Sequence, residues 1–488
     1  MSMAKNFAQH GVWGIDKYNF TSSSSSPLWT SSLALIYLLT GVNEVSPLIL
    51  DLVIGTLVVF GAYFIFRRYN MQPFLIFIAL LSIIFFTPLP VLILSGQEHV
   101  LQLLLTIFFV YLSAKALSDE KHTKNYLLLL ILAPLIVLTR YEGLFLIFVV
   151  SILFILRRRF LHSLWLVVAG VLPIAIYGVI SILNEWYFFP NSVFLKAVPF
   201  KFSLTGISKL LYHFGKETMT TPHIFILLLL ALFFLVLQFD KQKKIWKDSA
   251  IMLIIFIATT VLHMLFARSG WFYRYEAYLV GLGIFIISIV IHEYLPEKIS
   301  ITLDKNLIPK YLTITLLILG VISPLAGRGF KALILTPQAT TNIYEQQYQM
   351  GLFLKKFYQN ECVAANDIGA VNYLADIKSI DLMGLANLKV SKLKMEGKYN
   401  SQQLYKLAKQ ENTKIAIVYE RWFEKSGGIP SHWLKIGKWK INNNVVCGSN
   451  TVSFYAVDPA EADNLNKNLR AFSSSLPKDV VQSGNYLK

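Results

Sequence analysis

Ten long apolar runs dominate this sequence and restrict what the chain can fold into. Each approaches the ~20 residues that an α-helix needs to cross a bilayer, and flanking Lys, Arg and Tyr side chains can extend the shorter runs to the surface. Because a water-soluble protein has no use for so many such runs, the sequence predicts a polytopic α-helical membrane protein. The expected spans are 46–66, 72–93, 98–116, 125–140, 142–156, 160–183, 221–239, 249–267, 275–293 and 311–326.

The loops between these runs predict how the chain is oriented in the membrane. Basic residues fall at every second connection, and the positive-inside rule makes that side cytoplasmic. These loops account for the net charge of +17, so we expect no nucleic-acid partner. The basic connections are 67–68, 121–124, 157–159, 241–244 and 293–310, and the outward connections are 95–99, 140–142, 186–220 and 267–276.

The segments that flank the spans predict three further parts. Residues 1–45 form an external loop, in which the apolar stretch 28–42 is too short to span and is expected to be a helix lying in the membrane interface. Residues 46–326 make up the membrane domain. Helical and β-rich stretches then alternate over 335–460, which predicts a small extracytoplasmic α/β domain. The polar stretch 461–488 is expected to be a disordered tail.

The two cysteines, Cys362 and Cys447, both fall in the predicted α/β domain. An extracytoplasmic compartment is potentially oxidising, so they could form a disulfide, and the sequence equally allows two free thiols. The chain shows no P-loop, no HExxH or paired CxxC and no GxSxG motif. Its motifs therefore indicate no metal site and no required cofactor, and the sequence leaves open whether a divalent metal takes part.

Polar side chains gather in the connections that face outward. Glu98 with His99, and Arg140 with Glu142, interrupt or border apolar runs, where charge is costly unless it lines a site or reaches the surface. Arginine can bind a phosphate through two parallel hydrogen bonds, and lysine adds a point charge. Cations and carboxylates on one face therefore indicate an anionic, partly lipidic ligand, although each residue alone is also typical of an ordinary membrane boundary. The outer loops add Asn191, Lys196, Arg268, Tyr273 and Arg274.

Five short motifs follow one another along the chain: Ser26-Pro27-Leu28-Trp29-Thr30, Ser95-Gly96-Gln97-Glu98, Thr139-Arg140-Tyr141-Glu142-Gly143, Pro190-Asn191-Ser192 with Lys196, and Tyr273-Arg274-Tyr275. In this order they resemble the GT-C superfamily of polytopic glycosyltransferases, over nearly the whole chain. The branch that the chain is most similar to is that of the bacterial terminal arabinofuranosyltransferases of mycobacterial cell walls. The stretches 366–370 and 380–385 are similar to the start of that branch's C-terminal external domain.

The resemblance implies transfer of a sugar from a polyprenyl-phosphate donor to a glycan or lipid acceptor of the cell envelope. The reaction would take place at the outer face of the bacterial inner (plasma) membrane. Basic residues are expected to hold the donor phosphate: Arg140, Lys196, Arg274 and, in support, Arg268. Polar residues are expected to contact the substrates: Glu98, His99, Asn191 and Tyr273. His99 on its own is also typical of a packing residue.

The general base that must accept the proton of the acceptor hydroxyl is not among these motifs. In the family it is an aspartate just after the first span, and Met1–Asn6 resembles the segment that follows this aspartate. We therefore expect the chain to begin inside a longer reading frame. Among the residues present, Asp16, Glu98 and Glu142 are weak candidates for the base, and Asp16 is more typical of a plain turn.

Two other functions stay open at this point. A transporter or flippase for a lipid-linked glycan would use the same anionic lipid, although transporters usually carry polar or broken segments near the middle of the membrane. The interiors of the expected spans are nearly free of ionisable groups, which favours an enzyme. An inactive, truncated relative is the second alternative, because the first span and the aspartate are missing.

Overall fold

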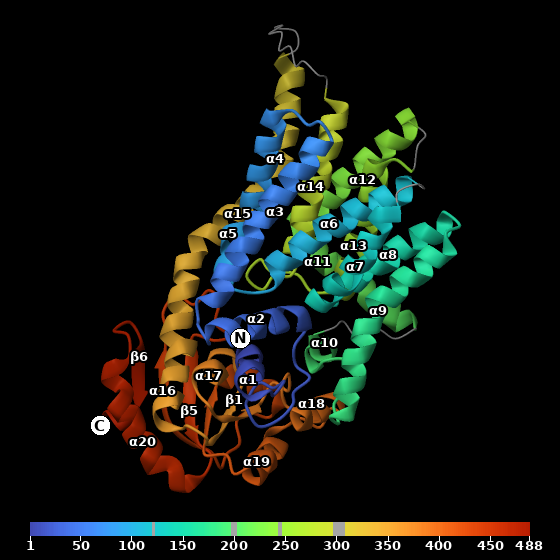
Figure 1. Cartoon of the computed structure of the whole chain (residues 1–488). Coiled ribbons are helices and arrows are strands. Elements are labelled where there is room, and N and C mark those ends of the chain that lie inside the picture. Colours follow the sequence, from blue (N-terminus) through green and yellow to red (C-terminus); the bar gives the residue numbers. More distant parts are fainter. Residues whose placement is uncertain (120–122, 197–202, 243–245, 296–307) are drawn as a thin grey trace.

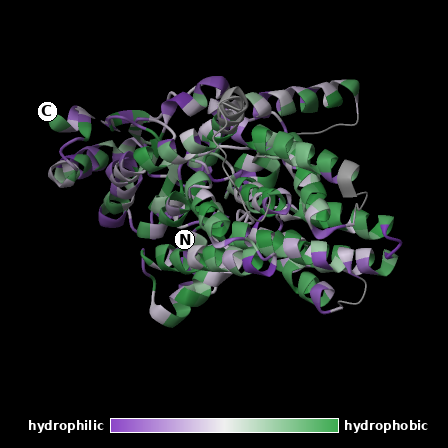
Figure 2. Ribbon diagram, turned by 90° about the horizontal axis from the view of Figure 1, so that it is seen from above, coloured by the Kyte–Doolittle hydropathy of each residue, from purple (hydrophilic) through white to green (hydrophobic). Residues whose placement is uncertain are grey.

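The computed structural model describes residues 1–119, 123–196, 203–242, 246–295 and 308–488. A long bundle of helices stands on a smaller α/β domain, and the N-terminus lies between the two (Figure 1). Figure 2 shows the bundle helices as largely hydrophobic, whereas hydrophilic residues are more frequent around the C-terminus. This arrangement confirms the predicted polytopic α-helical membrane protein with a C-terminal α/β domain.

Seven helices within the described residues are long and apolar enough to cross a membrane. They coincide with seven of the expected spans, because each is a run of apolar residues that satisfies its own backbone hydrogen bonds. They are α3 (Ser46–Arg68), α6 (His99–Ser118), α9 (Phe160–Leu183), α12 (Pro222–Gln242), α13 (Asp248–Phe266), α14 (Ala277–Tyr294) and α15 (Ile308–Ile343).

Three expected spans differ from the prediction. The run 72–93 is broken into α4 (Pro73–Phe86) and α5 (Leu89–Ser95), with a bend of 43°. Pro88 lies at this break, where its ring and missing N–H disfavour a continuous helix. The helices α7 (Thr123–Thr139) and α8 (Gly143–Leu156) have only 17 and 14 residues and are shorter than a full crossing. Because α7 and α8 are two consecutive helices, the change does not alter which side of the membrane we predict for the segments that follow them.

The basic ends of the helices gather at one end of the bundle. Lys115 of α6 forms an ion pair with Asp248 at the start of α13, and the Tyr69 hydroxyl donates to the same carboxylate over 3.3 Å. Arg157 after α8 donates to the carbonyl of Leu117 over 2.8 Å. These contacts bring the C-terminal ends of α3, α6 and α8 and the start of α13 together at one end of the bundle. The connections 121–124, 241–244 and 293–310 lie partly outside the described residues, and the assignment of this end to the cytoplasm remains a prediction.

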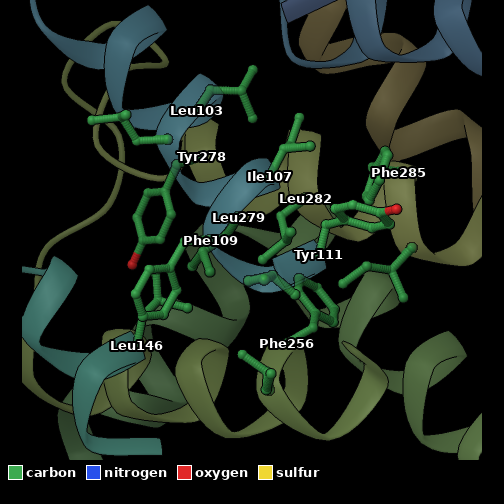
Figure 3. Close-up of a cluster of buried hydrophobic side chains, with 14 of the residues drawn as sticks. Leu103, Ile107, Phe109, Tyr111, Leu146, Phe256, Tyr278, Leu279, Leu282 and Phe285 are labelled. Atoms are coloured by element: carbon green, nitrogen blue, oxygen red, sulfur yellow. The ribbon is translucent and has the colours of Figure 1, made fainter. Parts of the chain in front are cut away.

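The core of the bundle lies between α6 and α14, the two most buried of the spanning helices (Figure 3). Ile107 and Phe109 of α6 and Leu282 and Phe285 of α14 are part of this apolar cluster. The two helices approach so closely that a Cβ atom at Gly281 would lie 2.5 Å from a methyl group of Leu103, so this position favours glycine. By contrast, α9 exposes many large apolar side chains, as expected of a helix that faces lipid.

The N-terminal segment folds into two helices, α1 (Ser2–His10) and α2 (Pro27–Thr40). The helix α2 lies across the end of the bundle nearest the α/β domain (Figure 1). One of its faces buries Leu33 and Tyr37, while Leu38 and Leu39 are exposed. A short helix at the predicted place with one exposed apolar face is what an interfacial position requires, and that position itself remains a prediction.

The helix α15 does not end at the expected boundary of 326. It continues through the π-helical segment η2 (Tyr344–Tyr348) into α16 (Gln349–Phe357), so the last span and the first helix of the α/β domain form one rod (Figure 1). The continuity follows from the sequence, because Pro309 lies in the first turn, where proline is tolerated, and Pro324 and Pro337 are the only prolines in the interior of α15. An α-helix tolerates isolated prolines when the freed carbonyls find other partners. Two shorter helices, α10 (Asn191–Lys196) and α11 (Leu204–Thr220), lie between α9 and α12.

The α/β domain is built on a six-stranded sheet with the order β2-β1-β3-β5-β4-β6. β1 pairs in parallel with both β2 and β3, and the remaining pairs are antiparallel. The strands are β1 (Cys362–Ala365), β2 (Lys378–Asp381), β3 (Ile415–Val418), β4 (Leu434–Lys440), β5 (Thr451–Ala456) and β6 (Val481–Gly484). The helices around them are α16, α17 (Gly369–Leu374), α18 (Leu388–Met395), α19 (Ser401–Gln410) and α20 (Ala462–Phe472).

The expected disordered tail is wrong. α20 buries Leu465, Leu469 and Phe472 against the sheet, and β6 pairs with β4 at the edge of the sheet. The three apolar residues follow the i, i+4, i+7 spacing of one helix face, which outweighs the polar composition of the segment. The α/β domain therefore extends to the end of the described chain.

The structure also contradicts the disulfide. Cys362 and Cys447 are both free and buried. Cys362 belongs to the apolar cluster that contains Ala364 and Ala416, and Cys447 belongs to the cluster that contains Val363 and Ile415. Because alternate strand residues point to opposite faces, the two thiols lie on opposite sides of the sheet.

Candidate functional site

The centre of the candidate site is Arg140, in the turn between α7 and α8. Its Nη1 donates to Oε1 of Glu98 over 2.9 Å. Its Nε and Nη2 donate to the two carboxylate oxygens of Glu142 over 3.1 and 2.6 Å. The turn is tight, because a Cβ atom at Gly143 would lie 2.8 Å from the carbonyl oxygen of Ile136. One planar guanidinium therefore holds two carboxylates from different parts of the chain in fixed positions.

The three charges stabilise one another in a buried place. Burial alone would raise the pKa of Glu98, but the charges of His99 and Arg140 and the Arg140 hydrogen bond lower it to about 2. Burial likewise opposes ionisation of Glu142, whose pKa is lowered to about 2 by the charge and hydrogen bonds of Arg140. The two carboxylates in turn raise the pKa of Arg140 against the effect of burial. Because two anions meet one cation, the cluster carries a net negative charge.

Arg274 lies next to this cluster and is bound differently. Its Nη1 donates to Oε1 of Gln97, and its Nε donates to the carbonyl of Trp271 over 3.0 Å. The ring of Tyr275 lies 5.9 Å from the Arg274 guanidinium and 5.3 Å from that of Arg140. Burial lowers the pKa of Arg274, and no carboxylate in the described part of the chain forms an ion pair with it. Arg274 is therefore a cation held in place by neutral groups.

The loop that carries Arg274 has an uncommon backbone. Gly270, Trp271, Phe272 and Tyr273 have φ angles of 87°, 47°, 59° and 64°. The left-handed region costs an L-residue about 1–2 kcal/mol, and such strain is usually found where the surroundings hold it for function. Here Glu276 accepts a hydrogen bond from the backbone N–H of Gly270 over 2.7 Å, which closes the loop.

A second buried ion pair supports the same loop. Arg328 of α15 donates to Oε1 of Glu276 over 3.0 Å, to the carbonyl of Tyr273 over 2.7 Å and to the carbonyl of Phe86 over 3.0 Å. The last of these bonds caps α4 at its break before α5. His223 of α12 lies 3.6 Å from the same Glu276 oxygen. Arg328 thereby links α15 and the α4–α5 bend to the loop that positions Arg274.

Asp51 is a further buried carboxylate of the site, after Glu98, Glu142 and Glu276. It lies on α3 with no exposed surface, within electrostatic range of Glu98 and against the backbone of Gln97. Within the described residues, neither of its oxygens makes a hydrogen bond of ordinary geometry. The residues that sequence reasoning missed are thus Asp51, Glu276, Arg328 and Gln97.

The structure brings together only part of the predicted site. Glu98, His99, Arg140, Glu142, Tyr273 and Arg274 lie in or beside the cluster described above. Arg268 is exposed in the loop after α13. Lys196 is the last residue of α10, and its side chain lies outside the described residues.

Two predicted residues connect the α/β domain to the bundle. The carboxylate of Asp16 accepts the backbone N–H groups of Tyr18 and Asn19 over 3.0 and 3.3 Å, and that of Ser379 in β2 over 3.2 Å. It therefore forms a turn, as the alternative interpretation of the sequence held. The Nδ2 of Asn191 donates to the carbonyl of Gly384 over 2.9 Å, which attaches α10 to the loop after β2.

Among the described residues, no three His, Cys, Asp or Glu side chains are arranged to hold a metal ion. The described side chains at the site offer a fixed guanidinium, carboxylates of low pKa and a cation without a carboxylate partner among the described residues. These groups suit recognition of a phosphate beside hydroxyl groups.

Two family models match the chain. Residues 24–183 match the model described as dolichyl-phosphate-mannose-protein mannosyltransferase, and this segment contains Glu98, Arg140 and Glu142. Residues 341–455 match a model described as a domain of unknown function. A comparison with curated proteins finds no match. The spanning helices support a multi-pass membrane protein, and the match over 24–183 shows that this segment is similar to a family of glycosyltransferases.

Proposed function

We propose that this protein transfers a sugar from a polyprenyl-phosphate donor to a glycan or lipid acceptor of the cell envelope. The observation that carries the proposal is the pairing of Arg274, a cation with no carboxylate partner among the described residues, with the anionic cluster around Arg140. A lipid phosphate supplies the anionic partner that Arg274 lacks among the described residues, and the carboxylates accept hydrogen bonds from sugar hydroxyls.

In this reaction the acceptor oxygen forms a bond to the anomeric carbon of the donor sugar, and the bond from that carbon to the phosphate oxygen breaks. The phosphate leaves with an additional negative charge, which a cation already in place stabilises without reorganisation. We assign this role to Arg274. We assign to Arg140 the positioning of Glu98 and Glu142, since its donors are used by those two carboxylates.

The proton of the acceptor hydroxyl must pass to a base. Glu98 and Glu142 suit this role poorly, because their pKa values of about 2 make them weak proton acceptors. Asp16 is engaged by three backbone N–H groups in a turn. We therefore propose that Glu98 and Glu142 bind hydroxyl groups, and we assign the base to none of the three.

We further propose that the site faces the outside of a bacterial inner membrane, together with the α/β domain. The clustering of Arg68, Lys115 and Arg157 at the opposite end of the bundle supports this orientation through the positive-inside rule. The resemblance to the arabinofuranosyltransferase branch supports arabinose as the transferred sugar, whereas the description of the matched family names mannose.

The test uses the purified chain in lipid nanodiscs with radiolabelled polyprenyl-phosphate arabinose or polyprenyl-phosphate mannose. A glycolipid extract of the source membranes serves as acceptor. We expect transfer from one donor and a loss of at least about tenfold in Arg274→Gln, because a lost charge-assisted hydrogen bond is worth about 1.5–3 kcal/mol. Arg67→Gln, the same change at an exposed residue of the opposite end, should have no effect. Movement of the labelled lipid across the bilayer without a transferred product would instead support a flippase.

A further inference from the structure

The α/β domain has a topological switch point between β1 and β3. After β1 the chain continues to β2 on one side, and it later returns to β3 on the other side, with all three strands parallel. In open sheets of this kind, ligands bind in the crevice outside the carboxyl ends of the strands at such a point. The residues at this edge are Asn366 and Asp367 after β1 and Tyr419 after β3.

A polar network fills this edge. The Tyr419 hydroxyl donates to Oε1 of Gln346 over 2.9 Å and lies 3.2 Å from Oδ2 of Asp367. The Nε2 of Gln347 donates to the same Asp367 oxygen over 3.1 Å. Oδ1 of Asn366 accepts the backbone N–H of Tyr419 over 3.0 Å, while its Nδ2 has no hydrogen-bond partner in the part of the chain that the structure describes, although the residue is only 5% exposed. A buried amide donor without a partner is unfavourable, so this edge is incomplete as it stands.

The two glutamines of the network come from the π-helical segment η2 (Tyr344–Tyr348). A single π-helical turn inside a longer helix is rare and is frequent at functional sites, because it changes the direction of the side chains that follow. Here it places Gln346 and Gln347 over the carboxyl ends of the strands. The family model of unknown function covers 341–455 and so includes the complete network.

This edge of the sheet faces the bundle. The Ser2 hydroxyl donates to the carbonyl of Gly369, and Asn191 donates to the carbonyl of Gly384, both over 2.9 Å. The Met1 amino group lies within electrostatic range of Glu98, so the start of α1 lies near the charged site. There is open space at the edge, because a Cβ atom at Gly369 would meet no atom within 4 Å.

The chemistry of the network selects a class of ligand. Its side chains are amides, a phenol, one half-buried carboxylate and the Cys447 thiol, which donates to Gln347 over 3.2 Å. None of their hydrogen bonds within the described residues comes from a lysine or arginine. A phosphate or other anion would meet no cation here. Neutral hydroxyl groups, which both donate and accept, match amides and carboxylates well.

From these observations we propose that the carboxyl edge of β1 and β3 is a binding site for a neutral saccharide. The site lies on the side of the α/β domain that faces the Arg140 cluster, so a saccharide held there is presented as the acceptor. The role as acceptor rests on the proposed function, whereas binding of the saccharide does not depend on it.

The test uses the purified full chain in detergent and immobilised neutral oligosaccharides derived from arabinan, mannan and galactan, with their phosphorylated counterparts. Asn366→Asp keeps the acceptor for the Tyr419 N–H and replaces the free donor. Asp367→Asn removes the charge that the network holds. We expect the intact chain to bind at least one neutral oligosaccharide, and each variant to bind it about tenfold more weakly, as for the loss of one buried hydrogen bond.

Asn400→Asp is the matched control, since Asn400 caps α19 with its side-chain oxygen and aspartate caps equally well. It should bind the saccharide as the intact chain does. The proposal is overturned if no neutral oligosaccharide binds, if the phosphorylated forms bind better, or if both edge variants bind normally. Thermal unfolding of each variant shows that it is folded before binding is measured.

Transfer assays on the same preparations separate the two proposals. If the chain binds a neutral oligosaccharide in a manner sensitive to Asn366→Asp but transfers no sugar, the glycosyltransferase proposal fails and the saccharide site stands. If the chain transfers sugar while Asn366→Asp and Asp367→Asn leave the KM for the acceptor extract unchanged, the role of this edge in presenting the acceptor is overturned, and the glycosyltransferase proposal stands.

Discussion

Arg328 and Glu276 form an ion pair with a 3.0 Å contact in which each side chain is only 2% exposed. The pair joins α15, which continues into the α/β domain, to the loop that carries Arg274. Removing one partner of a buried ion pair leaves an uncompensated charge, which costs more than the pair itself contributes. The pair therefore makes the position of Arg274 depend on a helix far from it in the sequence.

The first prediction concerns this pair. Arg328→Met should lower the free energy of unfolding by about 3–5 kcal/mol, because Glu276 is left buried without its partner. The double variant Arg328→Met/Glu276→Gln should be more stable than the sum of the single effects. Thermal unfolding of the two single variants and the double variant in detergent tests this prediction. If the effects of the two substitutions on stability simply add, the two side chains do not interact.

The second prediction separates charge from geometry at Arg140. Arg140→Lys keeps the positive charge, but a lysine cannot bond both oxygens of Glu142 and also reach Glu98. We expect a loss of about 1–3 kcal/mol in stability and a fall in sugar transfer of about tenfold or more. Arg67→Lys serves as the control. Unchanged transfer would mean that fixing the two carboxylates is not needed.

The third prediction concerns acid stability. The pKa of Glu142 is about 2 in the folded protein and has an ordinary value of 4.5, so its contribution to stability is complete above pH 4.5 and is lost as the pH falls toward 2. The unfolding temperature of the intact chain should therefore fall below pH 4.5. In Glu142→Gln this fall should be smaller. Parallel pH curves for the two proteins would contradict the assignment.

The fourth prediction concerns Asp51. Its carboxylate is buried without a hydrogen bond of ordinary geometry, so Asp51→Asn should raise stability by about 1–3 kcal/mol. If the carboxylate serves the reaction, sugar transfer should fall in the same variant, as in other trade-offs between stability and activity. Asp479→Asn, at an exposed position, is the control for both measurements. If Asp51→Asn is less stable than the intact chain, the buried carboxylate of Asp51 is stabilised by its surroundings, which would contradict the prediction.

The fifth prediction concerns the C-terminal segment. Removal of residues 462–488 takes away Leu465, Leu469 and Phe472, and each buried side chain of this size contributes about 2–5 kcal/mol. We expect the α/β domain to become sensitive to limited proteolysis. Lys467→Ala, on the exposed face of the same helix, should leave proteolysis unchanged. Equal resistance of the shortened chain would indicate that α20 does not stabilise the domain.

Much of the fold could be predicted because spanning helices depend on local composition. Runs such as 46–66 and 249–267 satisfy their own backbone hydrogen bonds, so their hydropathy alone identifies them. The lengths of α7 and α8 could not be predicted, because a run of apolar residues does not show where its helix meets neighbouring helices. The C-terminal helix was predictable from the spacing of Leu465, Leu469 and Phe472, but the polar composition around it favoured disorder.

The candidate site was predictable only where its parts are close in the sequence. Arg140 and Glu142 are two residues apart, and their pairing follows from the turn between two apolar runs. Arg328 and Glu276 are 52 residues apart, and Arg328 falls just after the expected end of a span, where a cation is ordinarily a boundary residue. Only the packing of α15 against the α4–α5 bend and the loop after α13 shows its role.

The continuous helix from the bundle into the α/β domain limits how the α/β domain can move relative to the bundle. The 39 residues from Leu319 to Phe357 would extend about 58 Å as a straight helix, nearly twice the ~30 Å hydrocarbon core of a bilayer. A rod of this length cannot be compressed or extended, so the α/β domain keeps a constant height above the charged site. The α/β domain can still tilt about Pro324, Pro337 and the π-helical turn. Such tilting would change the angle between a bound saccharide and the membrane, and it would leave the distance between them unchanged.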